Sequence, residues 1–481
     1  MEWKIILTLL LSVIAIATGT NYIADVYELD PTSSEVFFQN AVMDRRTRKI
    51  YVGAKNRLYE FDENLDVITE VKTGPAFDNP ACPVRKYACD EEKKELTQSF
   101  SKVILIDYEN NHLIHCISLY QGSCFKGDIN NIKNLEEIVV DDALVANNDS
   151  ATSFAFITPG PIKDEKGHFA SVINIGVQYT NKGFQRDRVY CFATRKLNNF
   201  ELAYKSLFRK SATILDSNNR QLFPIKYVYG FGSQGFSYMV TVQKPSPTLE
   251  SYITKIFRVC QKDLQYYSYA EVQLQCWHNG ALYNLAQAVY VGKAGVLLAK
   301  LLNIPDTEEV LYVSFSIGDP RSSNPTEDSA LCVYPMRTVR RIFSANIQDC
   351  FNGKGNTGPG YFYDAVRCKH TPNLQVNDEY CGDHKEVNSP TDGTDPISQE
   401  AAITFPSTIS SLTIDIVNEY TVAFAGTKKG HIYKVFSSYS FIIGSFFGKL
   451  LDRLLMFRVF NHLPSPTLFL HFDFMNLDHM S

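Results

Sequence analysis

Three short stretches have residue types and spacings that could support chemistry. Residues 353–358 spell G-x-G-x-x-G, but a dinucleotide-binding loop needs a strand before it and a helix opening at its end. His112, His115 and Cys116 could ligate zinc, but zinc takes four ligands and the sequence offers no partner cluster. Residues 232–235 (GSQG) miss the spacing of a nucleophile elbow. None of these patterns predicts an active site, so we expect no enzyme activity, no cofactor and no metal.

Cysteine is the residue type whose chemistry the sequence favours. The first twenty residues, MEWKIILTLLLSVIAIATGT, place Lys4 before an apolar run with small residues after it. This pattern is typical of a secretory signal peptide, which we assign to residues 1–19. A membrane anchor is the alternative, but the run is shorter than the roughly 20 residues that cross a bilayer. Most cysteines pair in an oxidising compartment, and the odd total of 11 leaves at least one over.

Composition narrows the class of protein further. Hydrophobic residues make up 45% of the 481 residues and charged residues 21%, so a sizeable core can form. The net charge of −5 lacks the basic excess of a nucleic-acid binder, and that class is excluded. Asn148-Asp149-Ser150 is an N-glycosylation sequon, which predicts a glycan on Asn148 in a surface loop.

The elements that must position these residues read as short strands. Residues 51–62 (YVGAKNRLYEFD) and 424–436 (FAGTKKGHIYKVF) repeat one hairpin-like pattern, and 227–243 is a further version. Hairpins repeated over several hundred residues predict a β-propeller. A β-sandwich array is the alternative, but the Cys and Trp spacing of immunoglobulin domains is missing. Residues 294–303 and 336–348 carry apolar residues at helical spacing.

Several motifs, in order along the chain, resemble the sema domain of plexins, the cell-surface receptors for semaphorins. YVGAKNRLYEFDENL is similar to the first-blade signature of that family. VKTGPAFDNPACPV, with Cys89 after it and then HCISLYQGSC, is similar to plexins and scatter-factor receptors rather than to semaphorins. The match covers residues 22–436 and continues through SYAEVQLQC, NLAQAVYVGKAGVLLAKLL, SALCVYPMRTVRRIF, IQDCFNGKG and YCGD.

This resemblance implies an all-β fold, a seven-bladed β-propeller with a small helical insertion in blade five. The inserted module is expected to include both helical segments. The resemblance also implies five disulfides: Cys82–Cys89, Cys116–Cys124, Cys260–Cys381, Cys276–Cys332 and Cys350–Cys368. The Cys260–Cys381 bond would clamp the base of the insertion and remove about 5 kcal/mol of unfolded-chain entropy. Cys191 is then left as a free thiol, packed as a small apolar residue in a strand-like run.

The function implied is that of a binding module. The resemblance implies the extracellular ligand-binding domain of a plexin-like receptor that binds semaphorins in cell or axon guidance signalling. In the family a semaphorin's sema domain meets blades three and four. We therefore expect the contact around residues 176–220, with the loop 353–369 nearby and with Arg186 and Arg188 as partner-binding residues. Homotypic or co-receptor contacts are further partners that the family allows.

Three alternatives stay open. A semaphorin-like ligand is disfavoured by the motifs around Cys89 and Cys124, and a scatter-factor-receptor type by the lack of a basic cleavage site. A secreted propeller enzyme should show paired carboxylates or a metal cluster. Asp141 and Asp142 are adjacent, so in a strand they point to opposite faces.

Residues 437–481 form an apolar tail that does not match the family. We expect the sema domain at residues 20–436 to be truncated and its propeller to be incomplete at the C-terminal blade, because the family's closing strands do not follow residue 436. Charged residues interrupt the tail, so no membrane span is predicted there. A gene-model artefact is the expected origin of the tail, and a natural secreted decoy is the alternative. The expected location is the secretory pathway and then the extracellular space or cell surface, with membrane anchoring only in a full-length receptor.

Overall fold

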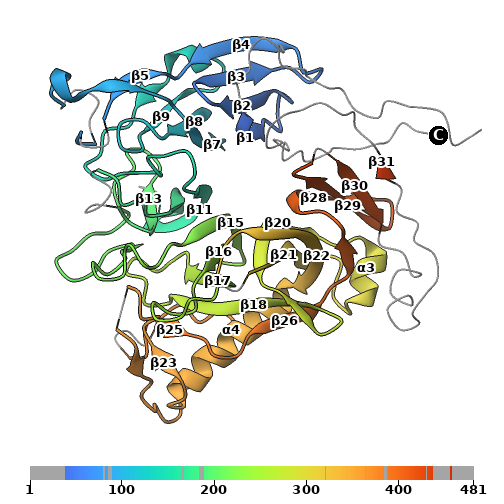
Figure 1. The fold of residues 1–481 in the computed structure, drawn as a ribbon. Coiled ribbons are helices and arrows are strands. Elements are labelled where there is room, and N and C mark those ends of the chain that lie inside the picture. The colour runs from blue at the N-terminus through green and yellow to red at the C-terminus, as the bar shows by residue number, and fades with distance from the viewer. Residues whose placement is uncertain are drawn as a thin grey trace, which may run out of the picture.

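The chain folds into a succession of small antiparallel sheets. The computed structural model describes residues 38–79, 82–84, 89–163, 167–183, 189–319, 321–362, 364–383, 387–429, 431–436 and 456–457. Within these residues there are five four-stranded sheets and one larger sheet, besides a two-stranded ribbon. Figure 1 shows the six main sheets arranged around a central axis, from blue at the first to red at the last. We call them the first to sixth blades.

The first three blades span residues 38–213. The first contains β1 (Phe38–Met43), β2 (Ile50–Ala54), β3 (Arg57–Phe61) and β4 (Val67–Lys72). The second contains β7 (Ser101–Asp107), β8 (His112–Ile117), β9 (Cys124–Asp128) and β10 (Glu136–Glu137). The third contains β11 (Ser153–Lys163), β12 (Phe169–Val177), β13 (Phe192–Lys196) and β14 (Ala212–Thr213). Between the first two blades lies the ribbon of β5 (Ala76–Asp78) and β6 (Glu95–Thr97).

The last three blades span residues 226–457. The fourth contains β15 (Lys226–Ser233), β16 (Phe236–Gln243), β17 (Ile253–Cys260) and β18 (Ala270–His278), with β19 (Ala281–Tyr283) beside β18. The fifth contains β20 (Leu285–Lys293), β21 (Glu309–Gly318), β22 (Pro325–Pro335) and β27 (Ile403–Phe405). The sixth contains β28 (Ile409–Val417), β29 (Tyr420–Thr427), β30 (Ile432–Phe436) and β31 (Met456–Phe457).

Contacts between blades run through their first strands. In order, the neighbouring pairs are β1 and β7, β7 and β11, β11 and β15, β15 and β20, and β20 and β28. Side chains from adjacent sheets share one core, so strands such as β16 are buried along their whole length. This radial stacking of antiparallel sheets is the arrangement of a β-propeller. The predicted all-β propeller class is confirmed, and the described residues supply six of the seven blades that the resemblance implies.

The repeated pattern in the sequence is a hairpin in each of two blades. Residues 51–62 form most of β2 with β3, and residues 424–436 form much of β29 with β30. Asn56, with φ of 62°, completes the two-residue turn of the first hairpin, and asparagine tolerates this left-handed conformation. Gly53 lies inside β2 rather than in the turn; a Cβ there would meet Ser101 Oγ of the second blade at 2.0 Å. This glycine therefore permits the close approach of two blades.

The insertion predicted in blade five lies between β22 and β27. It contains α4 (Met336–Phe351), β23 (Asn356–Thr357), β24 (Val366–Arg367), β25 (Thr391–Asp392) and β26 (Ile397–Glu400). Both β25 and β26 pair in parallel with β18, the outer strand of the fourth blade. The insertion therefore leaves from the fifth blade and docks on the fourth, below it in Figure 1.

The helix expected at residues 294–303 does not belong to the insertion, and that part of the prediction is wrong. Helix α3 (Val296–Leu301) connects β20 with β21 inside the fifth blade. Its N-terminus is held by the sixth blade, where Gly295 N–H donates to Thr421 Oγ1 at 2.8 Å. Leu298 and Ala299 are buried in the core shared by these two blades. The amphipathic spacing was correctly identified, but spacing cannot reveal which sheet receives the apolar face.

The end of the described chain has two features. Met456 and Phe457, from the expected tail, pair with Tyr433 and Ile432 on β30. No helix among the described residues is long and apolar enough to cross a membrane. The signal-peptide assignment for residues 1–19 lies outside the described residues.

Candidate functional site

The residues that resemble a zinc site have structural roles. His115 is fully buried in β8, and burial lowers its pKa to about 4. Its ring nitrogen Nε2 lies 2.9 Å from Ser101 Oγ. Cys116 is bonded to Cys124 and is not available as a ligand. Among the described residues, no group of three His, Cys, Asp or Glu side chains could hold a metal ion.

The two glycine patterns are turns. Gly353, Gly355 and Gly358 have positive φ angles. The stretch follows the end of α4 and contains the short strand β23, and no helix begins at its end. Residues 232–235 are the last two residues of β15 and the two-residue turn that leads into β16. Neither place has the strand-to-helix geometry that a phosphate loop or a nucleophile elbow needs.

Five disulfide bonds join the same pairs that the resemblance implies: Cys82–Cys89, Cys116–Cys124, Cys260–Cys381, Cys276–Cys332 and Cys350–Cys368. Cys260 lies at the end of β17, so its bond to Cys381 ties the insertion to the fourth blade. Cys276 and Cys332 connect β18 with β22, across the fourth and fifth blades.

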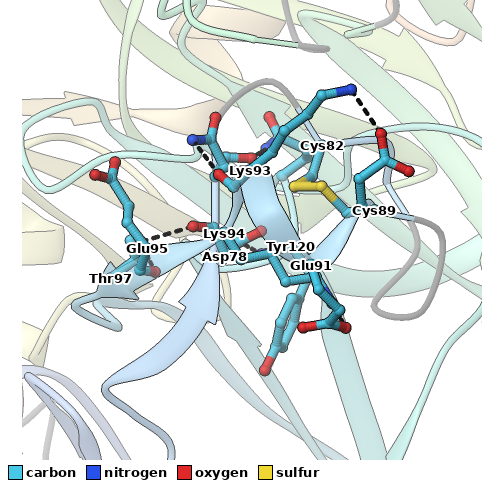
Figure 2. The surroundings of a disulfide bond; sticks show 12 residues. Asp78, Cys82, Cys89, Glu91, Lys93, Lys94, Glu95, Thr97 and Tyr120 are labelled. Atoms are coloured by element: carbon cyan, nitrogen blue, oxygen red, sulfur yellow. Dashed lines mark hydrogen bonds and ion pairs between the residues drawn. A yellow bond between two sulfur atoms is a disulfide. The ribbon is translucent and has the colours of Figure 1, made fainter.

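Figure 2 shows the disulfide between Cys82 and Cys89 beside the β5–β6 ribbon. Asp78 anchors this ribbon to the second blade, because its carboxylate accepts a hydrogen bond of 2.7 Å from Tyr120 N–H. Burial raises the pKa of Asp78. Phe77 and Leu96 pair across the ribbon and are 65% and 59% exposed. The ribbon is therefore a fixed surface feature with an apolar pair on it.

Cys191 is the one cysteine among the described residues that has no disulfide. It is buried, with its sulfur 3.3 Å from Thr213 Oγ1, and burial raises the pKa of the thiol to about 11. Because the thiolate is the reactive form, this cysteine should be chemically inert.

We expect peptide mapping of the native, non-reduced protein to recover the five disulfides above and an unmodified Cys191. Alkylation of Cys191 should require denaturant, because its sulfur is buried. A disulfide that includes Cys191, or a bond from Cys260 to any residue other than Cys381, would contradict this pairing.

The third blade presents an exposed apolar turn between β13 and β14. Leu207 and Phe208 are 94% and 90% exposed. Large apolar side chains this exposed, and adjacent, often mark an interaction site. We call residues 205–210 the contact turn. Sequence reasoning missed it, because YKSLFRKS shows neither strand alternation nor a turn dipeptide. Two apolar residues between Ser206 and Arg209 are the only signal that could have drawn attention to it.

Hydrogen bonds and ring contacts hold the contact turn. Ser206 N–H donates to the Arg209 carbonyl at 2.8 Å, and Arg209 N–H donates to Ser206 Oγ at 3.0 Å. The Arg209 guanidinium lies 4.6 Å from the ring centre of Tyr267 in the fourth blade. Lys210 lies 5.4 Å from the ring centre of Tyr190. The apolar tip is thus held between two blades and carries positive charge on its flanks.

Neighbouring loops from the third blade and the insertion are packed together, as expected for residues 176–220 and 353–369. Asp216 N–H donates to the Tyr361 carbonyl at 2.9 Å, and Asn219 Nδ2 donates to the Gly360 carbonyl at 3.3 Å. The rings of Phe223 and Tyr361 are stacked with centres 4.5 Å apart. Arg186 and Arg188, the residues proposed to bind a partner, lie outside the described residues.

A buried charge cluster fixes the Tyr361 loop on the fourth blade. The Lys255 ammonium is paired with the carboxylate of Glu271 and, at 3.0 Å, with that of Asp392 from the insertion. Tyr269 and Tyr361 both donate their hydroxyls to Glu271 Oε2. Burial raises the pKa of Asp392 to about 6. One cation therefore holds two carboxylates from two parts of the fold.

Comparison with known proteins agrees with the β-propeller fold. The Sema domain family matches residues 286–445. Plexin-A2 of Mus musculus is 31% identical over 450 residues, which are 87% of this chain and 23% of that protein. Plexin-A4 of Homo sapiens is 29% identical over 421 residues, which are 83% of this chain and 22% of that protein. This chain thus spans less than a quarter of the curated relatives that it matches.

Solved structures show the same fold. The full extracellular region of Plexin A4 superposes with a TM-score of 0.74 at 27% identity, over 84% of this chain and 46% of that chain. Drosophila Semaphorin 2a superposes with a TM-score of 0.58 at 17% identity, over 84% of this chain and 66% of that chain, which shows the fold alone. The described region is a sema domain. Within that class it is a sema domain of the plexin type.

Proposed function

We propose that this domain is the extracellular ligand-binding domain of a plexin-like receptor, and that it binds the sema domain of a semaphorin in cell or axon guidance signalling. Sequence similarity to plexins supports the receptor role. A solved structure with the same fold, at 14% identity and a TM-score of 0.52, is Drosophila Plexin A in complex with Semaphorin 1b. The role is binding rather than catalysis, at the cell surface or outside the cell.

The contact turn is the observation that carries this proposal. Burying one large apolar side chain contributes about 1.5–3 kcal/mol, so Leu207 and Phe208 together suit the centre of an interface. Their turn is already held by hydrogen bonds, so binding costs little conformational entropy. Lys205, Arg209 and Lys210 surround the tip with positive charge. A partner with an apolar hollow and an acidic rim would complement this surface.

Biolayer interferometry with a panel of semaphorin sema domains tests the proposal. A β-propeller outside the sema family serves as the control ligand. We expect saturable binding of at least one semaphorin with a Kd of about 1 µM or tighter, and no binding of the control. If the folded domain binds none of the panel, the proposed function is wrong.

Charge reversal at Arg186 and Arg188 is a second test of the same region. If the segment 179–188 lies at the rim of the contact, R186E and R188E should each weaken semaphorin binding by roughly two- to tenfold, mainly through a slower association rate. The effect should shrink as salt is raised, because rim charges are screened. Unchanged association rates for both variants would place the surface elsewhere.

Asn148 lies in the connection between β10 and β11 and is half-buried. Its Oδ1 accepts a hydrogen bond of 2.8 Å from Ala151 N–H, while Asp149 and Ser150 of the sequon are exposed. We expect the secreted domain to carry a glycan here. Glycosidase treatment should increase its gel mobility, and N148Q should migrate like the treated protein. Identical mobility of treated and untreated wild-type protein would exclude this glycan.

A further inference from the structure

A hollow lies where the insertion meets the fourth blade, next to the Tyr267 ring on which Arg209 packs. Its volume is about 900 Å³. One wall comes from the β15–β16 turn and the loop after β17, including Phe236 and Tyr267. The other wall comes from the insertion and includes Arg340 of α4 and Asp378, with the Cys260–Cys381 disulfide joining the two walls. The hollow is therefore a fixed feature of the fold.

The base of this hollow carries positive charge that the described residues do not fully compensate. Arg340 lines the hollow and is only 7% exposed. Its Nη2 donates to Glu308 Oε1 at 2.8 Å, but its Nη1 has no hydrogen-bond partner among the described residues. A buried guanidinium with an unused donor is unfavourable unless an acceptor reaches it.

Arg258 adds a second buried cation behind Phe236. It is fully buried, and its guanidinium lies 4.2 Å from the ring centre of Phe236 and 4.9 Å from that of Phe343 on α4. None of its three guanidinium nitrogens has a hydrogen-bond partner among the described residues. Burial lowers the pKa of Arg258 and the charge of Arg340 acts in the same direction, whereas the Tyr238 hydroxyl and the carboxylate of Asp378 act in the opposite direction. Two cations thus share one site with Glu308 as the hydrogen-bonded carboxylate.

We propose that this hollow binds a carboxylate through Arg340 Nη1, and that the carboxylate belongs to a chain segment with basic residues beside it. The charged residues at the edge of the hollow indicate which side chains lie beside the carboxylate in the ligand. Asp378, Glu379 and Asp383 line the hollow and are exposed, and these three carboxylates outnumber the one exposed lysine of the lining, Lys262. They would repel a multiply charged anion such as sulfate, and they would attract Lys or Arg side chains next to the carboxylate. Phe236 and Tyr267 offer apolar walls for the stems of those side chains.

Calorimetric titration with the capped peptide Ac-Lys-Ala-Glu-Ala-Lys-NH2 tests this site, with the Gln-for-Glu peptide as the control ligand. Binding of the Glu peptide should be about tenfold tighter or more than binding of the Gln peptide, because a charged hydrogen bond is lost. Free 6-aminohexanoate and inorganic sulfate form separate arms. Tighter binding of 6-aminohexanoate than of the peptide would mean that the site takes a small zwitterion and not a chain segment. Tighter binding of sulfate would contradict the role of the rim.

Variants separate this site from general effects on the fold. R340Q should weaken binding of the Glu peptide about tenfold or more. R337Q is the matched control, because Arg337 lies on the same helix, donates to the Asn303 carbonyl and does not line the hollow. E308Q should instead tighten binding, since it releases Arg340 from its competing carboxylate, and a merely structural role for Arg340 predicts no such gain. Equal affinity in wild type, R340Q and E308Q, or no preference for Glu over Gln, would overturn the proposal. Arg209 of the contact turn packs on Tyr267, which lines the hollow. The titration contains no semaphorin, however, and none of the substituted residues lies in the contact turn, so failure of this proposal can be told apart from failure of the proposed function.

Discussion

Replacing Leu207 and Phe208 together with aspartate is expected to lower the affinity of the domain for its semaphorin about a hundredfold or more. Each side chain is expected to act as an anchor, and truncating such an anchor costs about 2 kcal/mol or more. Both side chains are at least 90% exposed, so the free domain loses almost no packing. The thermal unfolding temperature of the double variant should therefore match that of the wild type. Interferometry and a melting curve measure the two quantities on the same preparation.

The β5–β6 ribbon offers a matched control for this pair. Phe77 and Leu96 are also neighbours on the surface, 65% and 59% exposed, and the double variant F77D/L96D makes the same chemical change on another part of the fold. We expect its semaphorin affinity to equal that of the wild type. If the ribbon variant loses binding and the contact-turn variant keeps it, the interface has been placed on the wrong blade.

Replacing Lys255 with methionine is expected to have the largest effect on stability. Lys255 and Glu271 are 5% and 1% exposed, so the variant leaves the buried carboxylate of Glu271 and the half-buried carboxylate of Asp392 without their cation. Breaking a buried pair from one side costs about 3–5 kcal/mol. Urea unfolding followed by tryptophan fluorescence or circular dichroism gives this loss as a change in the free energy of unfolding. Lys429, whose pair with Glu327 is exposed and 2.8 Å long, is the control, and K429M should cost less than about 1 kcal/mol.

The loss of unfolding free energy in K255M is expected to grow as the pH rises. In the folded protein burial raises the pKa of Asp392 to about 6, above the value of about 4 in an unfolded chain. Folding therefore favours the protonated carboxyl, and the contribution of Asp392 to stability decreases as the pH rises from about 4 to 6. Removing Lys255 raises this pKa further, because the charged form loses its partner. The cost of K255M should be larger at pH 7.5 than at pH 5, and an equal cost at both would contradict the charge cluster.

How far the sequence predicts this structure depends on how local each feature is. The hairpins of β2–β3 and β29–β30 follow from short apolar runs and a turn, and both were predicted from the sequence. The role of Gly53 does not follow from its own blade, because the atom it must avoid is Ser101 Oγ in the next one. Helix α3 shows the same limit, since its spacing predicts a helix but its partner strand is β29, more than 100 residues later.

The candidate sites depend on contacts between distant parts of the chain. Lys255 and Asp392 are separated by 137 residues, and no pattern in either segment indicates that they meet. The disulfide pairs came from family resemblance, because the spacing of the cysteines leaves many pairings open. Leu207 and Phe208 belong to no strand or turn pattern in the sequence, and only the structure shows them at an exposed turn.

Hydrogen–deuterium exchange of the domain with and without a bound semaphorin tests directly whether the contact turn is part of the binding surface. It reports which backbone amides become protected in the complex. We predict slower exchange at residues 205–210 of the contact turn and at residues 215–223. Exchange at residues 76–78 and 95–97 of the ribbon should be unchanged. Protection confined to the ribbon or the sixth blade, with the contact turn unchanged in a saturated complex, would contradict it.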